Sequence, residues 1–305
     1  MDTTQIEVTN ACVNACSNCT RFCGHQAPFF MSFEKFKRAV DSMVGYPKMT
    51  GMMGGEPLLH PAFEKLCDYM VSKIPREQLG LWSCFPKGYE KYREVICRTF
   101  GNIFLNDHGR ADIYHCPVLV AAEEMIQDRG RMFLMIDHCW LQNFWSASIN
   151  PKGAFFCEIA GSMSMLFGTN KGWKVEKEWW VRTPKDFTSQ IEEYCPKCGC
   201  AMPLPRRASV DGRDDISPGN LKRLTGRSKK IDSGEYVVSN LKPVEQLEEM
   251  AKYKDQEFRD AIAGRYGIFI VVNDKGFHAP HLKKTFGSAP KKKPLFDVYR
   301  EQYGK

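Results

Sequence analysis

Residues 6 to 19 read IEVTNACVNACSNC and carry three cysteines, Cys12, Cys16 and Cys19, in a C-x3-C-x2-C spacing. They follow a short alternating run, Gln5 to Thr9, which predicts the first β-strand of the chain. Thiolates select zinc, copper(I) or iron–sulfur clusters over cations that prefer oxygen. A structural zinc site normally closes with four protein ligands. Three thiolates on one loop therefore favour a [4Fe–4S] cluster whose fourth iron is open to another ligand.

A second loop, MMGGEP at Met52 to Pro57, follows the next predicted strand. Together with the cysteine spacing and the strand before it, this loop resembles the radical S-adenosylmethionine (SAM) superfamily. In that family the three-cysteine loop holds a [4Fe–4S] cluster, and the amine and carboxylate of SAM chelate the free iron. Reductive cleavage of SAM then gives a 5′-deoxyadenosyl radical, which takes a hydrogen atom from the substrate.

The resemblance assigns roles to individual residues of both loops. It implies that Cys12, Cys16 and Cys19 are cluster ligands, and that the SAM amino group is bound by Gly54, Gly55 and Glu56. The sequence departs from the family at Asn18, because the residue before the third cysteine is usually aromatic. A zinc knuckle or a chance group of buried thiols is the alternative.

Composition limits the class of protein. A chain of 305 residues with 43% apolar content can form one large domain with an appendage, or two modest domains. There is no apolar run of about 18 residues and no signal-like N-terminus, so we expect neither secretion nor membrane insertion. Thirteen cysteines then indicate a reducing, cytoplasmic setting. The net charge of +7 suits an anionic small molecule, and nucleic acid is a less favoured partner.

Strand-like and helix-like stretches alternate from residue 5 to about 138, which predicts an α/β fold with a parallel sheet. The predicted strands are Gln5–Thr9, Lys48–Met53, Leu79–Cys84, Ile103–Asn106 and Met132–Ile136. The predicted helices are Ser32–Val44, Pro61–Ile74, Tyr89–Phe100 and Pro117–Gln127. The family resemblance implies a partial (β/α) barrel, in which both loops open onto the face at the carboxyl ends of the strands.

Three regions are expected along the chain. Residues 1–138 form the radical SAM partial barrel, and residues 139–205 form a small cysteine-rich auxiliary-cluster domain. Residues 206–305 form a linker or mobile loop followed by a basic C-terminal α+β extension. That extension is predicted to contain a helix at Pro243–Ala263 and a strand at Gly267–Val272.

A second set of cysteines lies in the middle region, at Cys139, Cys157, Cys195 and Cys198. Four thiolates from three segments can hold a zinc ion or a [4Fe–4S] cluster, and the spacing does not choose between them. The pattern resembles the twitch module, a shortened SPASM domain that holds one auxiliary [4Fe–4S] cluster behind a radical SAM barrel. Cys200 is the alternative to Cys198 as the last ligand.

Other candidate residues follow the later strands. Ser83 and Asn106 stand where the family places polar residues that touch the SAM ribose or carboxylate, although turn residues also occur there. His108 and Arg110 are candidates for a substrate base or anchor, with a solvated loop as the alternative. Two thiols near the active face, Cys84 and Cys116, could return a hydrogen atom to a substrate radical, whereas Cys67 and Cys97 in predicted helices are expected to be small buried hydrophobic residues.

The sequence thus predicts a radical SAM enzyme of oxidoreductase type. Its substrate would be a carbohydrate-like alcohol to be dehydrogenated, or a nucleotide-linked small molecule to be epimerised. An external one-electron reductant such as flavodoxin or ferredoxin would be its partner. The alternatives are an enzyme that modifies a ribosomally made peptide and, from another class, a non-catalytic iron–sulfur or zinc protein that binds nucleic acid.

Overall fold

The fold is built on one mostly parallel sheet with strand order β11-β4-β3-β2-β1-β6-β7. The computed structural model describes residues 3–106, 108–109, 111, 113–137, 139, 141, 146–202, 204–239 and 271–272. Within these, the strands of the sheet are β1 (Thr3–Thr9), β2 (Met49–Gly54), β3 (Leu79–Ser83), β4 (Asn102–Leu105), β6 (Ser146–Asn150), β7 (Gly153–Phe155) and β11 (Val271–Val272). Strands β1 to β4 pair in parallel in chain order, as predicted, and β6 pairs in parallel with the other side of β1.

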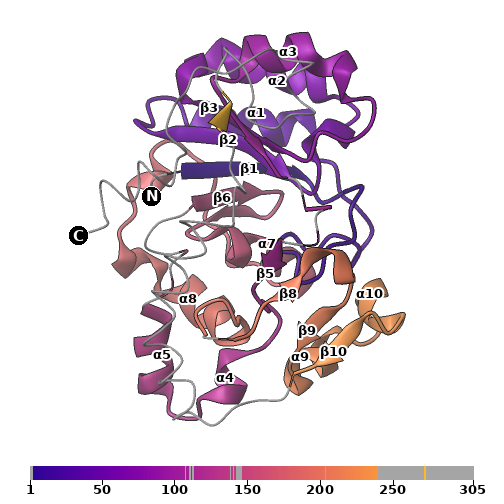
Figure 1. The fold of residues 1–305 in the computed structure, drawn as a ribbon. Helices are drawn as coiled ribbons and strands as arrows, with labels where there is room; N and C mark the ends of the chain where they lie inside the picture. The colour runs from indigo at the N-terminus through magenta and orange to yellow at the C-terminus, as the bar shows by residue number, and fades with distance from the viewer. Residues whose placement is uncertain are drawn as a thin grey trace, which may run out of the picture.

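Helices α1 (Phe33–Ser42), α2 (Phe63–Lys73) and α3 (Arg93–Thr99) cover one face of this sheet (Figure 1). The short helices η1 (Pro57–Leu59), η2 (Arg76–Gln78) and η3 (Tyr89–Tyr92) belong to the same connections. Ser32 caps α1 by accepting a hydrogen bond from the Lys35 backbone N–H, as its position in the sequence predicts. Alternate residues of β1, such as Ile6 and Val8, are fully buried under these helices and form the main core.

The opposite face of the sheet is covered by α7 (Glu158–Leu166), which follows the hairpin of β6 and β7 (Figure 1). Near it lie α4 (Ala122–Met125), α5 (Arg129–Asp137), α8 (Thr188–Tyr194), η5 (Pro184–Phe187) and η6 (Cys195–Lys197). The short helix η4 (Trp179–Val181) instead packs against the end of α1, where the Trp180 indole donates to the Ser42 carbonyl at 3.2 Å. The hairpin, which the sequence assigned to a separate cysteine-rich region, therefore continues the main sheet. This arrangement brings the second set of cysteines to the face opposite α1, α2 and α3.

Residues 207 to 238 do not form the linker or mobile loop that their polar composition indicated. They form β8 (Arg207–Ala208), η7 (Ser209–Asp211), β9 (Asp214–Ile216), α9 (Pro218–Leu224), α10 (Lys229–Asp232) and β10 (Tyr236–Val238). Strand β8 pairs with β5 (Tyr114–His115), and β9 pairs with β10. Polar side chains such as Asp214 and Lys230 are buried here, because they bond to other parts of the chain. We call residues 207 to 238 the clasp.

Two further predictions of secondary structure differ from the fold. Met132 to Ile136 is not a strand but part of α5, because Met132 and Ile136 are buried four residues apart on one helical face. Of the predicted helix Pro117–Gln127, only Ala122–Met125 is helical. The predicted helix at Pro243–Ala263 lies outside the described residues, as does most of the strand at Gly267–Val272.

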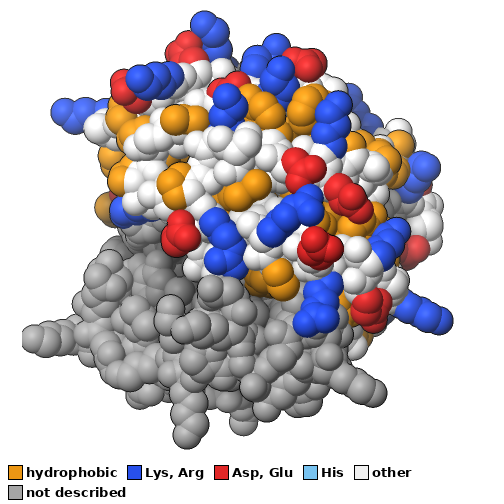
Figure 2. Space-filling model, turned by 90° about the horizontal axis from the view of Figure 1, so that it is seen from above, with side chains coloured by type: hydrophobic (Ala, Val, Ile, Leu, Met, Phe, Trp, Pro, Cys, Tyr) orange, Lys and Arg blue, Asp and Glu red, His pale blue; other side chains and the backbone are white. Residues whose placement is uncertain are grey.

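The distribution of charge on the outer surface bears on which partners the protein could bind. On the side seen in Figure 2, Lys and Arg side chains are interspersed with acidic and hydrophobic ones. Across the part of the chain that the structure describes, no helix has both the length and the apolar character needed to span a membrane.

Candidate functional site

The three cysteines of the first loop surround a cavity of about 60 Å³ at the carboxyl ends of β1 and β2. Cys12, Cys16 and Cys19 all line it, and Gly54 and Gly55 form part of its wall. The two loops singled out in the sequence therefore meet at one place. This agrees with the rule that loops following parallel strands gather at the same edge of a sheet.

Gly54 and Gly55 allow the two loops to touch. A Cβ atom on Gly54 would lie 2.0 Å from the Thr9 carbonyl oxygen, and one on Gly55 would lie 2.2 Å from that of Ala11. The Gly55 N–H donates to the Thr9 carbonyl at 2.8 Å. A larger residue at either position would push the glycine loop away from the cysteine loop.

Glu56 and Ser83 support the cavity without lining it. The buried Glu56 carboxylate accepts hydrogen bonds from the Ser83 hydroxyl at 2.8 Å, the Cys84 N–H at 2.8 Å and the Leu58 N–H at 3.0 Å. Burial raises the pKa of Glu56, and these bonds lower it in part. The side chain therefore ties the loops after β2 and β3 together, whereas the resemblance implied contact with SAM.

Cys84 and Asn106 line the cavity. The Cys84 thiol donates to Glu56 at 3.0 Å, and burial, followed by the Glu56 charge, strongly raises its pKa. The thiol is thus held protonated beside the first set of cysteines. Asn106 continues from β4, and its N–H donates to the Ser83 carbonyl.

Two histidine rings also line the cavity. His108 and His115 lie edge to face, with ring centroids 4.6 Å apart. His115 Nδ1 is 2.7 Å from the Ser17 carbonyl oxygen, which fixes the orientation of its ring. Burial, followed by the charge of His115, lowers the pKa of His108 to about 3, so this ring is neutral at neutral pH. Arg110, the other residue predicted in this loop, lies outside the described residues.

Cys23 is a cavity residue to which the sequence gave no role. A hydrogen bond to the Cys23 side chain is the main cause that lowers the pKa of Cys12 and that of Cys19, the latter to about 5. Burial instead raises the pKa of Cys16 to about 12. The sequence did contain a signal for Cys23, because it follows Cys19 by a spacing as short as those between the first three cysteines.

The donor set of this cavity fits an iron–sulfur cluster. Cys12, Cys16 and Cys19 face a common space, and the glycine loop opposite provides backbone to it. Among the residues that the structure describes, no three His, Cys, Asp or Glu side chains are arranged to hold a single metal ion.

The second set of cysteines also comes together, although its members are far apart in sequence. Cys139 follows α5, Cys157 joins β7 to α7, and Cys195 and Cys198 lie at η6. They share one hydrophobic cluster, in which Cys139 and Cys157 are buried. The charges of Cys139, Cys157 and Cys198 all act on Cys195, and burial is the main cause that raises its pKa.

Two more thiols lie at this second site. Cys200 hydrogen-bonds to the side chains of Cys116 and Cys139, and its N–H lies 3.4 Å from the Cys198 sulfur. Cys116 is not among the residues that line the first cavity. Of the two thiols that the sequence offered as hydrogen-atom donors, only Cys84 faces that cavity.

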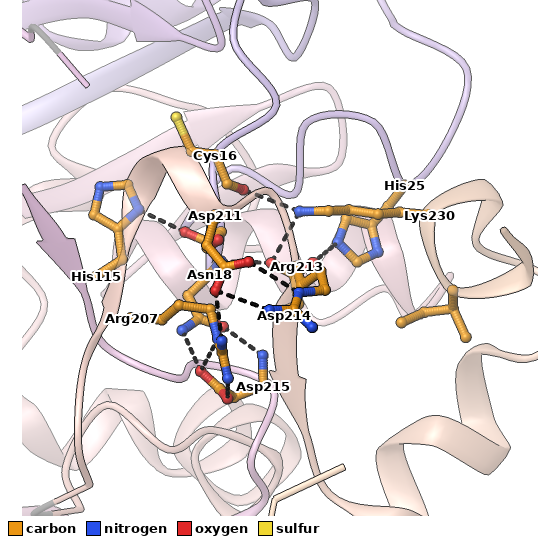
Figure 3. Close-up of polar contacts among 12 residues, drawn as sticks. Cys16, Asn18, His25, His115, Arg207, Asp211, Arg213, Asp214, Asp215 and Lys230 are labelled. Atoms are coloured by element: carbon orange, nitrogen blue, oxygen red, sulfur yellow. Dashed lines mark hydrogen bonds and ion pairs between the residues drawn. The ribbon is translucent and has the colours of Figure 1, made fainter. Parts of the chain in front are cut away.

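Asn18, the position where the sequence departs from the family pattern, joins the cysteine loop to the clasp (Figure 3). Its backbone has φ = 50°, a left-handed conformation that asparagine tolerates better than most residues. Its N–H donates to Asp214 at 2.5 Å, and its side-chain amide donates to the Asp215 carboxylate at 2.8 Å. The Asp215 N–H returns a bond of 2.8 Å to the Asn18 side-chain oxygen. Asn18 is therefore a loop anchor.

Asp214 is the centre of the contact between the clasp and the cysteine loop (Figure 3). His25 Nε2 lies 2.8 Å from its carboxylate, and the Lys230 ammonium donates to it at 3.0 Å. Burial alone would raise the pKa of Asp214, but the hydrogen bond from His25 and the Lys230 charge lower it. Lys230 also donates to the Cys16 carbonyl at 3.0 Å, so the clasp holds the backbone of a predicted cluster ligand.

Of three comparisons with known proteins, only the search of solved structures found matches. No protein-family model matches the sequence, and no curated protein matches it. A crystal structure of BtrN in complex with AdoMet and 2-DOIA matches at 14% identity and a TM-score of 0.42, over 65% of this chain and 88% of that chain. A selenomethionine BtrN structure in an open conformation matches at 15% identity and 0.42, over 65% and 86%. At these values the likeness concerns the course of the backbone alone.

Proposed function

We propose that this protein is a radical SAM enzyme with a second, auxiliary iron–sulfur site. The observation that carries the proposal is the single cavity onto which Cys12, Cys16, Cys19 and the two glycines of the second loop all face. A [4Fe–4S] cluster bound there would hold SAM at its fourth iron and supply the electron that generates the 5′-deoxyadenosyl radical. The protein's own residues bind SAM, orient the substrate and exclude water.

The cavity wall offers suitable groups for each part of SAM. Gly54 and Gly55 present backbone to the amino group, and Asn106 presents an amide to the ribose or carboxylate. Adenine stacks on planar side chains. Among the described residues that line the cavity, only His108 and His115 carry rings, and we assign the adenine contact to them. Asn18 is engaged with Asp215 and does not take this role.

For the reaction, we propose oxidation of a carbohydrate-like alcohol. BtrN was crystallised with AdoMet and 2-DOIA, and we carry over only this class of substrate. Oxidation of an alcohol by hydrogen-atom abstraction leaves one electron to be removed, together with the hydroxyl proton. Four thiols that come together at Cys139, Cys157, Cys195 and Cys198 suit a cluster that accepts this electron. Flavodoxin or ferredoxin would supply the electron that cleaves SAM.

The test is the metal content and spectroscopy of protein purified and reconstituted without oxygen. We expect about eight irons per chain, from two [4Fe–4S] clusters, and an EPR signal that changes when SAM is added. Cys16→Ala should lose about half of the iron together with the SAM response. Cys157→Ala should lose the other half and retain the response. Cys97→Ala, in helix α3 and outside both sites, is the matched control and should retain all of the iron.

Formation of 5′-deoxyadenosine from SAM under reducing conditions tests the chemistry, with 2-DOIA as the first candidate substrate. Zinc as the only bound metal, with no spectroscopic response to SAM, would contradict the proposed function. Iron in both sites without turnover of 2-DOIA would contradict the choice of substrate alone.

A further inference from the structure

A buried ion pair joins the neighbourhoods of the two cysteine sites. Arg21 lies two residues after Cys19, and Glu158 directly follows Cys157. Arg21 Nη2 lies 3.1 Å from Glu158 Oε2, and the two side chains are only 3% and 6% exposed. A buried charge is costly to maintain, so this pair needs a structural or functional reason.

The contacts of Arg21 place it between the two sites. Its guanidinium donates to the Glu158 carbonyl at 3.2 Å and to the Ser162 hydroxyl at 3.4 Å, both on α7. It also contacts Met53 Sδ at 3.1 Å, and it lines the cavity of the first cysteine set. The charges of both Cys19 and Cys157 act on it. One cation therefore lies within electrostatic reach of both sets of thiols.

A second carboxylate, Glu7 on β1, is buried beside this pair. Its Oε2 atom has no hydrogen-bond partner among the described residues, and neither has the Nε of Arg21. Burial raises the pKa of Glu7 to about 7, although the Arg21 charge opposes the increase. Glu158 is thus the direct counterion of Arg21, and Glu7 is a second nearby carboxyl group, whose pKa lies close to neutral pH.

We propose that Arg21 is an electrostatic bridge between the two iron–sulfur sites, which sets the reduction potentials of both, with Glu158 as the opposing charge. The inference rests on the proposed function, because it requires a cluster at each set of cysteines. Reduction adds a negative charge to a cluster, so a nearby cation favours the reduced state and a nearby anion disfavours it. Arg21 is a positioning residue in this role, because it acts on the clusters through charge.

The experiment is an EPR-monitored redox titration of both clusters in the reconstituted full-length protein. Arg21→Met removes the cation and should lower both potentials, whereas Glu158→Gln removes the anion and should raise both. At about 10 Å and an effective dielectric constant of about 20, one unit charge changes a one-electron equilibrium by roughly tenfold. A tenfold change corresponds to about 59 mV for a one-electron couple. Arg21→Lys keeps the charge and should restore most of the shift.

Structural damage would not shift the potentials in opposite directions, so the signs separate the proposal from a general loss of packing. Arg98→Met removes an exposed arginine that pairs with Asp68, and as the control it should leave both potentials unchanged. If Arg21→Met does not assemble clusters, Glu158→Gln and Arg21→Lys carry the test.

The failures of this inference and of the proposed function can be told apart. A wild-type protein without a SAM-responsive cluster would contradict the proposed function. Two clusters in the wild type whose potentials do not move, or of which only one moves, would overturn the bridge. Zinc at the second site with a SAM-responsive cluster at the first would likewise overturn the bridge and leave the SAM chemistry standing.

Discussion

Lys230 provides the sharpest test of how the cysteine loop is held. Its ammonium donates to Asp214 and to the Cys16 carbonyl, each at 3.0 Å, and the side chains of the ion pair are 2% and 1% exposed. Lys230→Met fills a similar volume without the charge. It leaves the Asp214 carboxylate buried with His25 as its remaining side-chain partner. Removing one member of a buried ion pair costs about 3–5 kcal/mol, and we expect the lower end because the His25 contact remains.

The assay is urea unfolding of the purified protein under anaerobic, reducing conditions, followed by circular dichroism. Arg98→Met is the matched comparison, because its pair with Asp68 has the same charges with side chains that are 49% and 58% exposed. An exposed pair contributes about 0–1 kcal/mol. If Lys230→Met costs no more than Arg98→Met, the clasp does not hold the loop in the way that its hydrogen bonds indicate.

Three further predictions concern other parts of the site. Glu7 has a folded-state pKa of about 7 against an ordinary 4.5, so its contribution to stability should fall by about 3 kcal/mol as the pH rises from 4.5 to 7. Glu7→Gln should abolish this decrease in urea titrations at several pH values, and an unchanged pH dependence would refute the assignment. Gly55→Ala places a Cβ 2.2 Å from the Ala11 carbonyl and should lose most SAM binding in a calorimetric titration, whereas Gly130→Ala, with its nearest atom at 3.3 Å, should not. Asn18→Phe introduces the aromatic residue usual in the radical SAM loops that this loop resembles, but it leaves the Asp215 N–H without its acceptor. We therefore expect a loss of about 1–3 kcal/mol in the same unfolding assay, and no loss would show that the anchor is dispensable.

Local patterns in the sequence predicted the part of the fold that depends on local physics. Four strands with the loops after them follow from alternation and turn residues, and the meeting of the cysteine and glycine loops follows from parallel pairing. The prediction of a strand at Met132 to Ile136 was wrong, because a short apolar run is compatible with a buried strand as well as with a helix. The residues around Asp214 were interpreted as a linker because their polarity suggested solvent. Their partners, Asn18 and Lys230, supply the bonds that water would otherwise provide.

The side-chain details of the site were less predictable. The turn of Glu56 toward Cys84 depends on how two loops pack, and nothing in GGEP indicates it. The role of Asn18 depends on residues that come almost two hundred positions later, so no local pattern could reveal it.

The long reach of the clasp has a consequence for the order in which the protein is made. The bonds from Asn18 to Asp214 and from Lys230 to Cys16 span 196 and 214 residues. Contacts of such separation form late, because a long loop must close before they contribute. At a synthesis rate of roughly 5–20 residues per second, the first three cysteines leave the ribosome ten seconds or more before Lys230. During that interval the thiols lack the contacts that fix their loop, so we expect stable insertion of metal to follow synthesis of the clasp.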